Sequence, residues 1–475
     1  MDQSARGELT PIVPGNLGGT DARQRGRSVA RLSEQKASAI DRLYALSPKA
    51  IWDVVKRQRP SFWFVCIYLF FEYVRPQQIY KPILGPPYAR ITILLALASF
   101  LLERRKFRFR VPELLLAAFS IVVVASSFTA FDPSVSSDKL SEYFTWVLIY
   151  VLIANTVDTE ERFLVFILSF LLYSFKMSQF GTRIWADRGF AFASWGATGA
   201  PGWFQNSGEF GIQMCIFLPI LIAFIVALGK RWPRWLRVAT WAVAATAVTG
   251  IVASSSRGAF IGLAAVVLWL LLKSQNKFRA LFVTLAVVGL VYAITPEKLK
   301  NRFQQAGEDE TSVSRMTMWK QGLEMMRDYP VLGIGYANWQ KYDSVHYGGT
   351  GLLAHNTFIQ AGSELGYTGL ATFLALIACT FVINRRTRKL AEPASDRGRF
   401  IFYMAHGLDG ALVGFIASGF FISVLFYPFF WINFAMTVAL HNAALASLPI
   451  ENSSPLAQHP PGWRRGLRGA VRPAS

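Results

Sequence analysis

The chain has 475 residues, of which 53% are hydrophobic and 14% aromatic, and its formal net charge at pH 7 is +20. Its mean hydropathy of +0.32 is too high for an ordinary soluble domain of this length. The 49 Lys and Arg residues do not form a nucleic-acid-binding patch, because most of them flank apolar segments on one side. The composition therefore predicts a polytopic membrane protein, with anionic lipid headgroups facing most of the basic charge.

Apolar segments along the chain approach the length of about 17–25 residues that a helix needs to cross a bilayer. The distribution of basic residues places both termini on the cytoplasmic side. The predicted fold is all-α, N-in and C-in, with about twelve transmembrane helices and a large periplasmic loop containing short helices between spans 9 and 10. The predicted spans are centred near Tyr68, Leu95, Val122, Leu148, Ile167, Leu218, Ala244, Val266, Val287, Phe373, Phe415 and Met436.

These spans divide the chain into four parts. Residues 1–37 are polar and rich in Gly and Arg, which predicts a disordered basic cytoplasmic N-terminus. Residues 38–59 alternate apolar with basic side chains and are expected to lie on the inner membrane face as an amphipathic helix. Residues 60–453 form the twelve-span domain, and the Pro-rich residues 454–475 form a cytoplasmic tail.

The first outer loop that is long enough to hold a site covers about 176–208. Its Gly and aromatic content is typical of an irregular loop at the level of the lipid headgroups. Lys176, Arg183 and Arg188 are candidates for holding a phosphate or a sugar there, since all three are basic.

The second outer loop, residues 296–354, interrupts the series of apolar segments. Residues 314–329 within it have a helical period that places Arg315, Trp319 and Leu323 on one face. Pro330 ends this helix, and the glycines that follow predict a turn.

Several polar residues of this region have an ordinary structural interpretation. Arg257 follows three serines at the start of a span, where an arginine often extends to the headgroups. His355 stands at a helix entry, where a histidine is usually a hydrogen-bonded structural residue. The acidic residues 308–310 favour a solvated loop run over a metal site. His346 and Tyr347 are read either as lining an acceptor path or as exposed loop residues.

Three motifs, taken together, favour function over these structural interpretations. The first is Ser256-Arg257-Gly258 at the start of a span. The second is Ser314-Arg315 with Trp319, followed by the segment YPVLGIG at 329–335. The third is the segment HNTF at 355–358, followed by ELGYTGL at 364–370. In their order and spacing these motifs resemble the bacterial O-antigen ligase family.

The resemblance implies a membrane glycosyltransferase that takes a glycan from a polyprenyl-diphosphate lipid, such as undecaprenyl diphosphate, in the bacterial inner membrane. It implies that Arg257 and Arg315 engage the diphosphate and that His355 is the base. Trp319 and Asn356 belong to the same motifs and are candidate substrate-binding residues. The acceptor of such enzymes is a lipid, protein or glycan outside the inner membrane.

The chemistry of these residue types agrees with that role. The planar arginine fork binds phosphate oxygens through two hydrogen bonds and stays charged at any working pH. Two arginines would replace the divalent cation of many sugar transferases, so we expect no metal and no cofactor. Neutral histidine is a natural base for activating a hydroxyl near pH 7. The predicted reaction is a direct displacement with inversion at the anomeric carbon.

Two other functions remain open from the sequence. An O-antigen or exopolysaccharide polymerase would use the same donor with a second lipid-linked glycan as acceptor, and the sequence separates it poorly from a ligase. A twelve-span transporter is the alternative from another class. The basic segment SDRGR at 395–399 resembles a loop of major-facilitator carriers, but it has no counterpart in the first half of the chain.

Overall fold

The computed structural model describes residues 39–447, apart from 81–84, 105–106, 192–195, 275, 296, 298–299, 301–308, 350, 392 and 394. The expected disordered N-terminus, the C-terminal tail and most of 296–308 lie outside the described residues. The helices are α2 (Pro48–Lys56), α3 (Pro60–Tyr73), α4 (Pro76–Ile79), α5 (Tyr88–Leu102), α6 (Val111–Phe128), α7 (Pro133–Thr156), α8 (Glu160–Asp187), α9 (Ser207–Leu228), η2 (Gly229–Arg231), α10 (Arg234–Ala253), α11 (Arg257–Lys273), α12 (Lys277–Ile294), α14 (Glu310–Asp328), α15 (Trp339–His346), α16 (Thr357–Leu390), α17 (Asp396–Gly419) and α18 (Pro428–Ser447).

The prediction of an all-helical protein is confirmed over the described ranges, which contain helices and no strand. Each of the twelve predicted span centres falls within one of these helices. Among the described residues, seven helices are long and apolar enough to cross a membrane, namely α6, α8, α9 with η2, α10, α16, α17 and α18. Crossing by α3, α5, α7, α11 and α12 remains a prediction, and so does the orientation of the bundle.

The chain divides into two units after Lys56, and the structure describes residues 39–56 of the first unit. In its described part, residues 39–44 are helical and α2 follows after a turn. Leu46 in that turn has a left-handed φ of 54°. The expected single amphipathic helix over 38–59 is therefore interrupted, because a non-glycine residue in this conformation cannot continue a right-handed helix.

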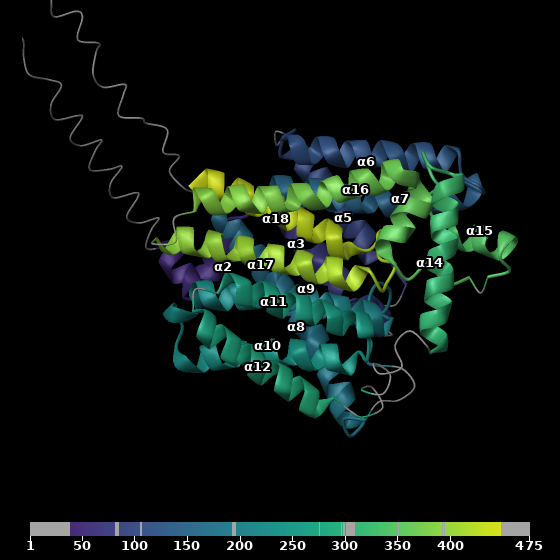
Figure 1. Cartoon of the computed structure of the whole chain (residues 1–475). Coiled ribbons are helices and arrows are strands. Elements are labelled where there is room, and N and C mark those ends of the chain that lie inside the picture. Colours follow the sequence, from purple (N-terminus) through teal and green to yellow (C-terminus); the bar gives the residue numbers. More distant parts are fainter. Residues whose placement is uncertain are drawn as a thin grey trace, which may run out of the picture. The chain divides into compact units, whose positions relative to one another are not determined.

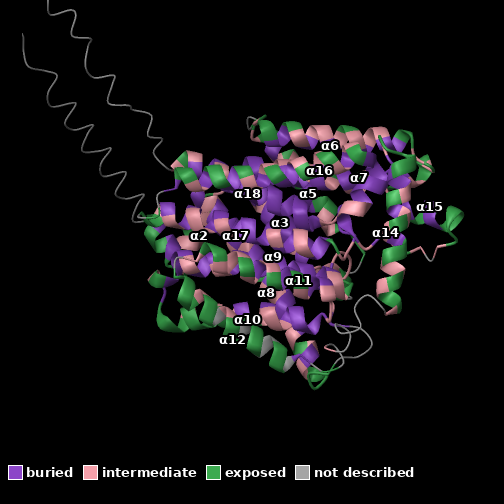
Figure 2. Cartoon of the chain, viewed as in Figure 1, coloured by how far each residue is buried: buried purple, intermediate pink, exposed green. Residues whose placement is uncertain are grey.

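Helix α9 lies at the centre of the second unit and is buried along most of its length (Figure 2). Its first turn is capped by Asn206, whose side chain accepts from the Gly208 amide at 2.8 Å, while Glu209 accepts from the Asn206 amide at 3.1 Å. Glycines let the neighbouring helices approach closely. A Cβ on Gly262 of α11 would lie 2.0 Å from Ser418 Oγ of α17 and 3.0 Å from Cys215 Sγ of α9.

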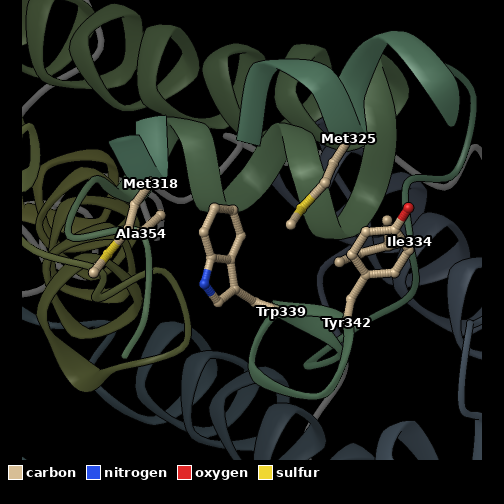
Figure 3. Packing of buried hydrophobic residues seen from close by; sticks show 6 residues of the cluster. All are labelled: Met318, Met325, Ile334, Trp339, Tyr342 and Ala354. Carbon is tan, nitrogen blue, oxygen red and sulfur yellow. The ribbon is translucent and has the colours of Figure 1, made fainter. Parts of the chain in front are cut away.

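Helices α14 and α15 lie together at one end of the helical bundle, and α14 runs across the ends of the bundle helices (Figure 1). They pack through a buried apolar cluster in which Trp339 lies between the two methionines of α14 (Figure 3). The members of this cluster are Met318, Met325, Ile334, Trp339, Tyr342 and Ala354. Because Ala354 directly precedes His355, the cluster fixes the backbone that leads to this histidine.

Candidate functional site

Arg257 is the first residue of α11. Ser256 caps this helix by accepting a hydrogen bond from the Ala259 amide at 3.4 Å, and Ser255 before it has a left-handed φ of 53°. The Arg257 side chain is only 9% exposed, and its Nη1 and Nη2 donate to Asp309 Oδ1 and Oδ2 at 2.9 and 2.8 Å. The arginine fork is therefore already engaged by a planar anionic group.

Asp309 was expected in a solvated acidic run, and that expectation is wrong for this residue. Its side chain is 23% exposed and pairs with Arg257 through both oxygens. Although Asp309 stands at the N-cap of α14, its carboxylate makes no capping hydrogen bond and accepts instead from Arg257 and the Ser312 hydroxyl. Hydrogen bonding to Arg257 holds the pKa of Asp309 well below its usual range.

Helix α14 carries Arg315 and Trp319 as predicted, but it begins four residues earlier than the sequence period suggested. Its buried face consists of Met318, Gly322, Met325 and Met326. Arg315, Trp319 and Leu323 share a helical face as predicted, but this is not the buried face, because Leu323 is 56% exposed and the other two are half-buried. Trp319 instead donates from Nε1 to the Ala354 carbonyl at 3.0 Å, at the edge of the helix that faces His355.

His355 precedes α16 and has a left-handed φ of 50°. Asn356 caps α16 by accepting from the amides of Phe358 and Ile359 at 2.9 and 3.1 Å. Burial and, to a smaller extent, the positive charge of Arg315 lower the pKa of His355 to about 4. Arg315 therefore acts electrostatically on His355, and both effects favour the neutral imidazole.

The starts of three helices meet at the connection between α17 and α18, residues 420–427. Thr357 Oγ1 of α16 donates to the Ile422 carbonyl at 2.7 Å. A Cβ on Gly258 of α11 would lie 2.8 Å from Phe421 Cβ, and one on Gly208 of α9 would lie 3.0 Å from Ile422 Cδ1. Helix N-termini carry partial positive charge, so their convergence beside Arg257 favours binding of an anion.

The segments around the glycines of the second and third motifs pack against each other and share backbone hydrogen bonds. Gly333 and Gly366 have φ of +68° and +70°, and Gly366 kinks α16. The amide of Ile334 donates to the Ser363 carbonyl at 2.9 Å, and the amide of Tyr367 donates to the Pro330 carbonyl at 2.8 Å. The two motifs are therefore one structural joint, which couples the turn after α14 to the helix that begins beside His355.

We expect Gly366→Ala to lower the free energy of unfolding by about 1–3 kcal/mol through the left-handed backbone alone. The added Cβ would lie 2.4 Å from the backbone carbon of Val331, which increases the loss. Thermal unfolding in detergent measures the effect. Gly289→Ala on α12 is the matched control, because its Cβ would meet nothing within 4 Å and its stability should be unchanged or slightly higher. Equal stabilities of the two variants would contradict the proposal that the two motifs form one structural joint.

The basic residues of the first outer loop lie differently from the expectation. The loop was predicted from about residue 176, but α8 continues to Asp187, so Lys176 and Arg183 are helical and only Arg188 follows the helix. The Lys176 ammonium lies 5.5 Å from the centre of the Phe180 ring, and Arg183 is exposed. The contacts described for these basic residues do not include Arg257 or His355.

His346 and Tyr347 lie at the end of α15. The His346 ring stacks on Tyr342 with centroids 4.0 Å apart, and the Tyr347 hydroxyl donates to Glu324 at 3.3 Å. Both therefore pack on the α14 and α15 side of the buried cluster. Glu364 accepts from the Trp339 amide at 3.4 Å.

An apolar bundle whose described part contains seven helices able to cross a membrane defines a polytopic membrane protein. Residues 242–374 match the family model described as O-antigen ligase, and this segment contains Arg257, Arg315 and His355. Residues 50–181 match a family of unknown function, DUF5935. The chain is 23% identical over 306 residues to the exopolysaccharide production protein ExoQ of Rhizobium meliloti (strain 1021), covering 60% of this chain and 68% of that protein.

The matched segment is similar to the O-antigen ligase family. The two matches support a membrane enzyme that resembles a ligase or a polymerase. Two features of the site had no signal in the sequence. Asp309 lies 52 positions from its partner Arg257, and the 420–427 connection, which holds the start of α16, falls outside the matched segment.

Proposed function

We propose that the protein transfers a glycan from a polyprenyl-diphosphate donor to an acceptor hydroxyl at the outer face of the cytoplasmic membrane. The observation that supports this most is the half-buried His355 directly before α16, next to the Ala354 carbonyl that Trp319 of α14 binds and within the electrostatic influence of Arg315. A fixed cation beside an unprotonated imidazole suits a reaction in which an anionic group leaves and a hydroxyl loses its proton. Arg257 contributes a second fork within the same matched segment.

In the proposed reaction, the acceptor oxygen forms a bond to the anomeric carbon from the face opposite the diphosphate. The bond between the anomeric carbon and the diphosphate oxygen breaks, and its electron pair leaves with the diphosphate. His355 takes the acceptor proton. Arg257 and Arg315 balance the charge of the leaving group, and the helix N-termini at the 420–427 connection add partial positive charge.

Binding of the donor diphosphate makes His355 a stronger base in the proposed arrangement. With a pKa of about 4, free His355 is unprotonated above that pH but takes up a proton weakly. A diphosphate bound to Arg315 cancels the positive charge that lowers this pKa, so the basicity of His355 rises when the donor is in place. In the free enzyme, the acid limb of kcat/KM is expected near pH 4, below the value of about 6.5 typical of histidine.

We expect Arg315→Gln to raise the pKa of His355 toward its usual value, since the variant removes the neighbouring positive charge. The titration is followed by NMR of the histidine ring protons in nanodiscs, and the His355 signal is assigned from its loss in His355→Gln. Lys320→Ala is the control, because Lys320 is an exposed cation on the same helix. An unchanged titration in Arg315→Gln would contradict the proposed closeness of the two groups.

A polymerase is the second candidate, and the match to an exopolysaccharide production protein favours it. In that case the acceptor hydroxyl belongs to a second lipid-linked glycan. The same site serves both reactions, because the donor and the departing diphosphate are the same.

Reconstitution tests the proposal and separates the two candidates. Purified protein in proteoliposomes receives lipid-diphosphate-linked glycan prepared from the host membranes, first alone and then with host membrane acceptors. A ladder of longer lipid-linked glycans from the donor alone identifies a polymerase, while a single transfer that needs the added acceptor identifies a ligase. Release of no diphosphate lipid under either condition would overturn the proposed function.

A further inference from the structure

A second group of aromatic side chains lies on α14 and α15, away from Arg257. We call it the Tyr342 cluster, and it consists of Phe131, Tyr329, Tyr342, His346 and Tyr347. Tyr342 is its centre: its ring centroid lies 4.0 Å from that of His346, 5.2 Å from Phe131, 5.9 Å from Tyr329 and 6.3 Å from Tyr347. Phe131 is contributed by the connection between α6 and α7, so distant chain segments build the cluster together.

The cluster has a packed centre and an exposed rim. Tyr342 is 7% exposed, whereas Tyr329, Phe131 and Tyr347 are 43%, 40% and 37% exposed. Large aromatic rings that are held by packing and still accessible at their edges are typical of binding surfaces.

The rim also presents polar groups. The Tyr347 hydroxyl donates to Glu324 at 3.3 Å. Burial raises the pKa of Tyr347, and the charge of Glu324 raises it further, so this phenol stays protonated. The surface therefore offers hydroxyl donors and carboxylate acceptors, which suit a ligand rich in hydroxyl groups.

The same carboxylates argue against a phosphate at this surface. Glu324 and Asp328 are acidic side chains near the phenols, and they disfavour binding of the donor diphosphate. Glu324 follows Arg315 by nine residues on α14, which corresponds to about 14 Å along the helix axis. The surface is thus separated from the site of Arg315 but is carried by the same rigid element.

The cluster is held in place before any ligand binds. The Phe131 amide donates to the Ile334 carbonyl at 2.8 Å, and the Asp132 amide donates to Asn338 Oδ1 at 2.8 Å. A surface fixed in this way loses little conformational freedom when it binds a ligand.

We propose that the exposed rim of the Tyr342 cluster binds an uncharged stretch of the acceptor glycan, some sugar units away from the hydroxyl that reacts at His355. This inference rests on the proposed glycan transfer, since it identifies where that reaction holds its acceptor. The rings contact the apolar faces of the sugars, and the phenols and Glu324 bind their hydroxyl groups.

The test measures sugar binding separately from catalysis. Oligosaccharides of one and two repeating units, released from the surface polysaccharide of the host cells, are titrated against the full chain in nanodiscs, with ligand-detected NMR as the readout. Tyr329→Ala/Tyr347→Ala should weaken binding of the two-unit oligosaccharide at least tenfold. Affinity for inorganic diphosphate should stay unchanged. Tyr329→Phe/Tyr347→Phe keeps the rings and should lose less.

Two variants separate failure of this inference from failure of the proposed function. His355→Ala should bind the oligosaccharide as the wild type does while losing transfer. Tyr292→Ala removes an exposed tyrosine of α12 and should change neither property. Wild-type oligosaccharide affinity in Tyr329→Ala/Tyr347→Ala would overturn the inference, and so would an equal loss of diphosphate affinity, which indicates general damage to the fold.

Discussion

Replacing His355 with Ala is expected to lower the rate constant of glycan transfer by about 10²–10⁴-fold, because the acceptor hydroxyl then has no positioned group to take its proton. Donor affinity should change little, since the arginines that bind the diphosphate remain. Single-turnover transfer from bound lipid-linked donor measures the chemical step directly. Transfer at the wild-type rate would exclude His355 as the base.

The contacts around His355 predict that the His355→Ala variant should lose activity but keep its fold. Trp319 holds the Ala354 carbonyl and Asn356 caps α16 through backbone amides, so neither contact depends on the imidazole. The His355→Ala protein should therefore unfold at nearly the wild-type temperature. A large loss of stability would instead indicate that the histidine is structural, which is the common role of a histidine at a helix entry.

Arg257→Ala is expected to lower transfer by about 10²–10³-fold, the usual effect of removing one preorganised donor at a developing negative charge. Arg257→Lys should restore only part of the activity, because an ammonium group lacks the fork that binds two oxygens at once. Initial rates at saturating and subsaturating donor separate the effects on kcat and KM. Full activity of Arg257→Lys would contradict a requirement for the fork.

The pairing of Arg257 with Asp309 predicts a variant that binds diphosphate more tightly than the wild type. Asp309 engages the same two nitrogens that would hold a phosphate, at 2.8 and 2.9 Å. Asp309→Asn removes the competing charge and should bind inorganic diphosphate several-fold more tightly. Glu310→Gln is the matched control, since Glu310 is the next residue and is exposed. Weaker binding by Asp309→Asn would show that the carboxylate positions the arginine.

The sequence was a good guide to features that are local. Each of the twelve span centres predicted from the apolar runs falls within an observed helix. The length and polarity of a segment decide whether it can form a buried helix, and both can be read from the sequence. The helix over 314–329 and its end at Pro330 were predicted for the same reason, since helical period and a missing amide act within a few residues.

Features that depend on distant partners were predicted poorly. Leu323 shares the helical spacing of Arg315 and Trp319, but the buried face of α14 is set by Trp339 and Ile359, which contact Gly322 from other segments. Lys176 was assigned to a loop because the segment from about 176 to 208 is rich in Gly and aromatic residues. The helix continues to Asp187 with Met177, Gly181 and Trp185 buried along it, which the local composition does not reveal.

The 420–427 connection holds the start of α16. Grafting the candidate site onto another protein therefore requires this connection as well. Asn356 donates from its amide to Ser423 Oγ at 3.3 Å, and Thr357 binds the Ile422 carbonyl, yet both partners lie beyond the segment that carries the two arginines and the histidine. A chimera that imports only residues 242–374 would inherit the reactive side chains on an unsupported helix start. A portable unit must therefore include the 420–427 connection.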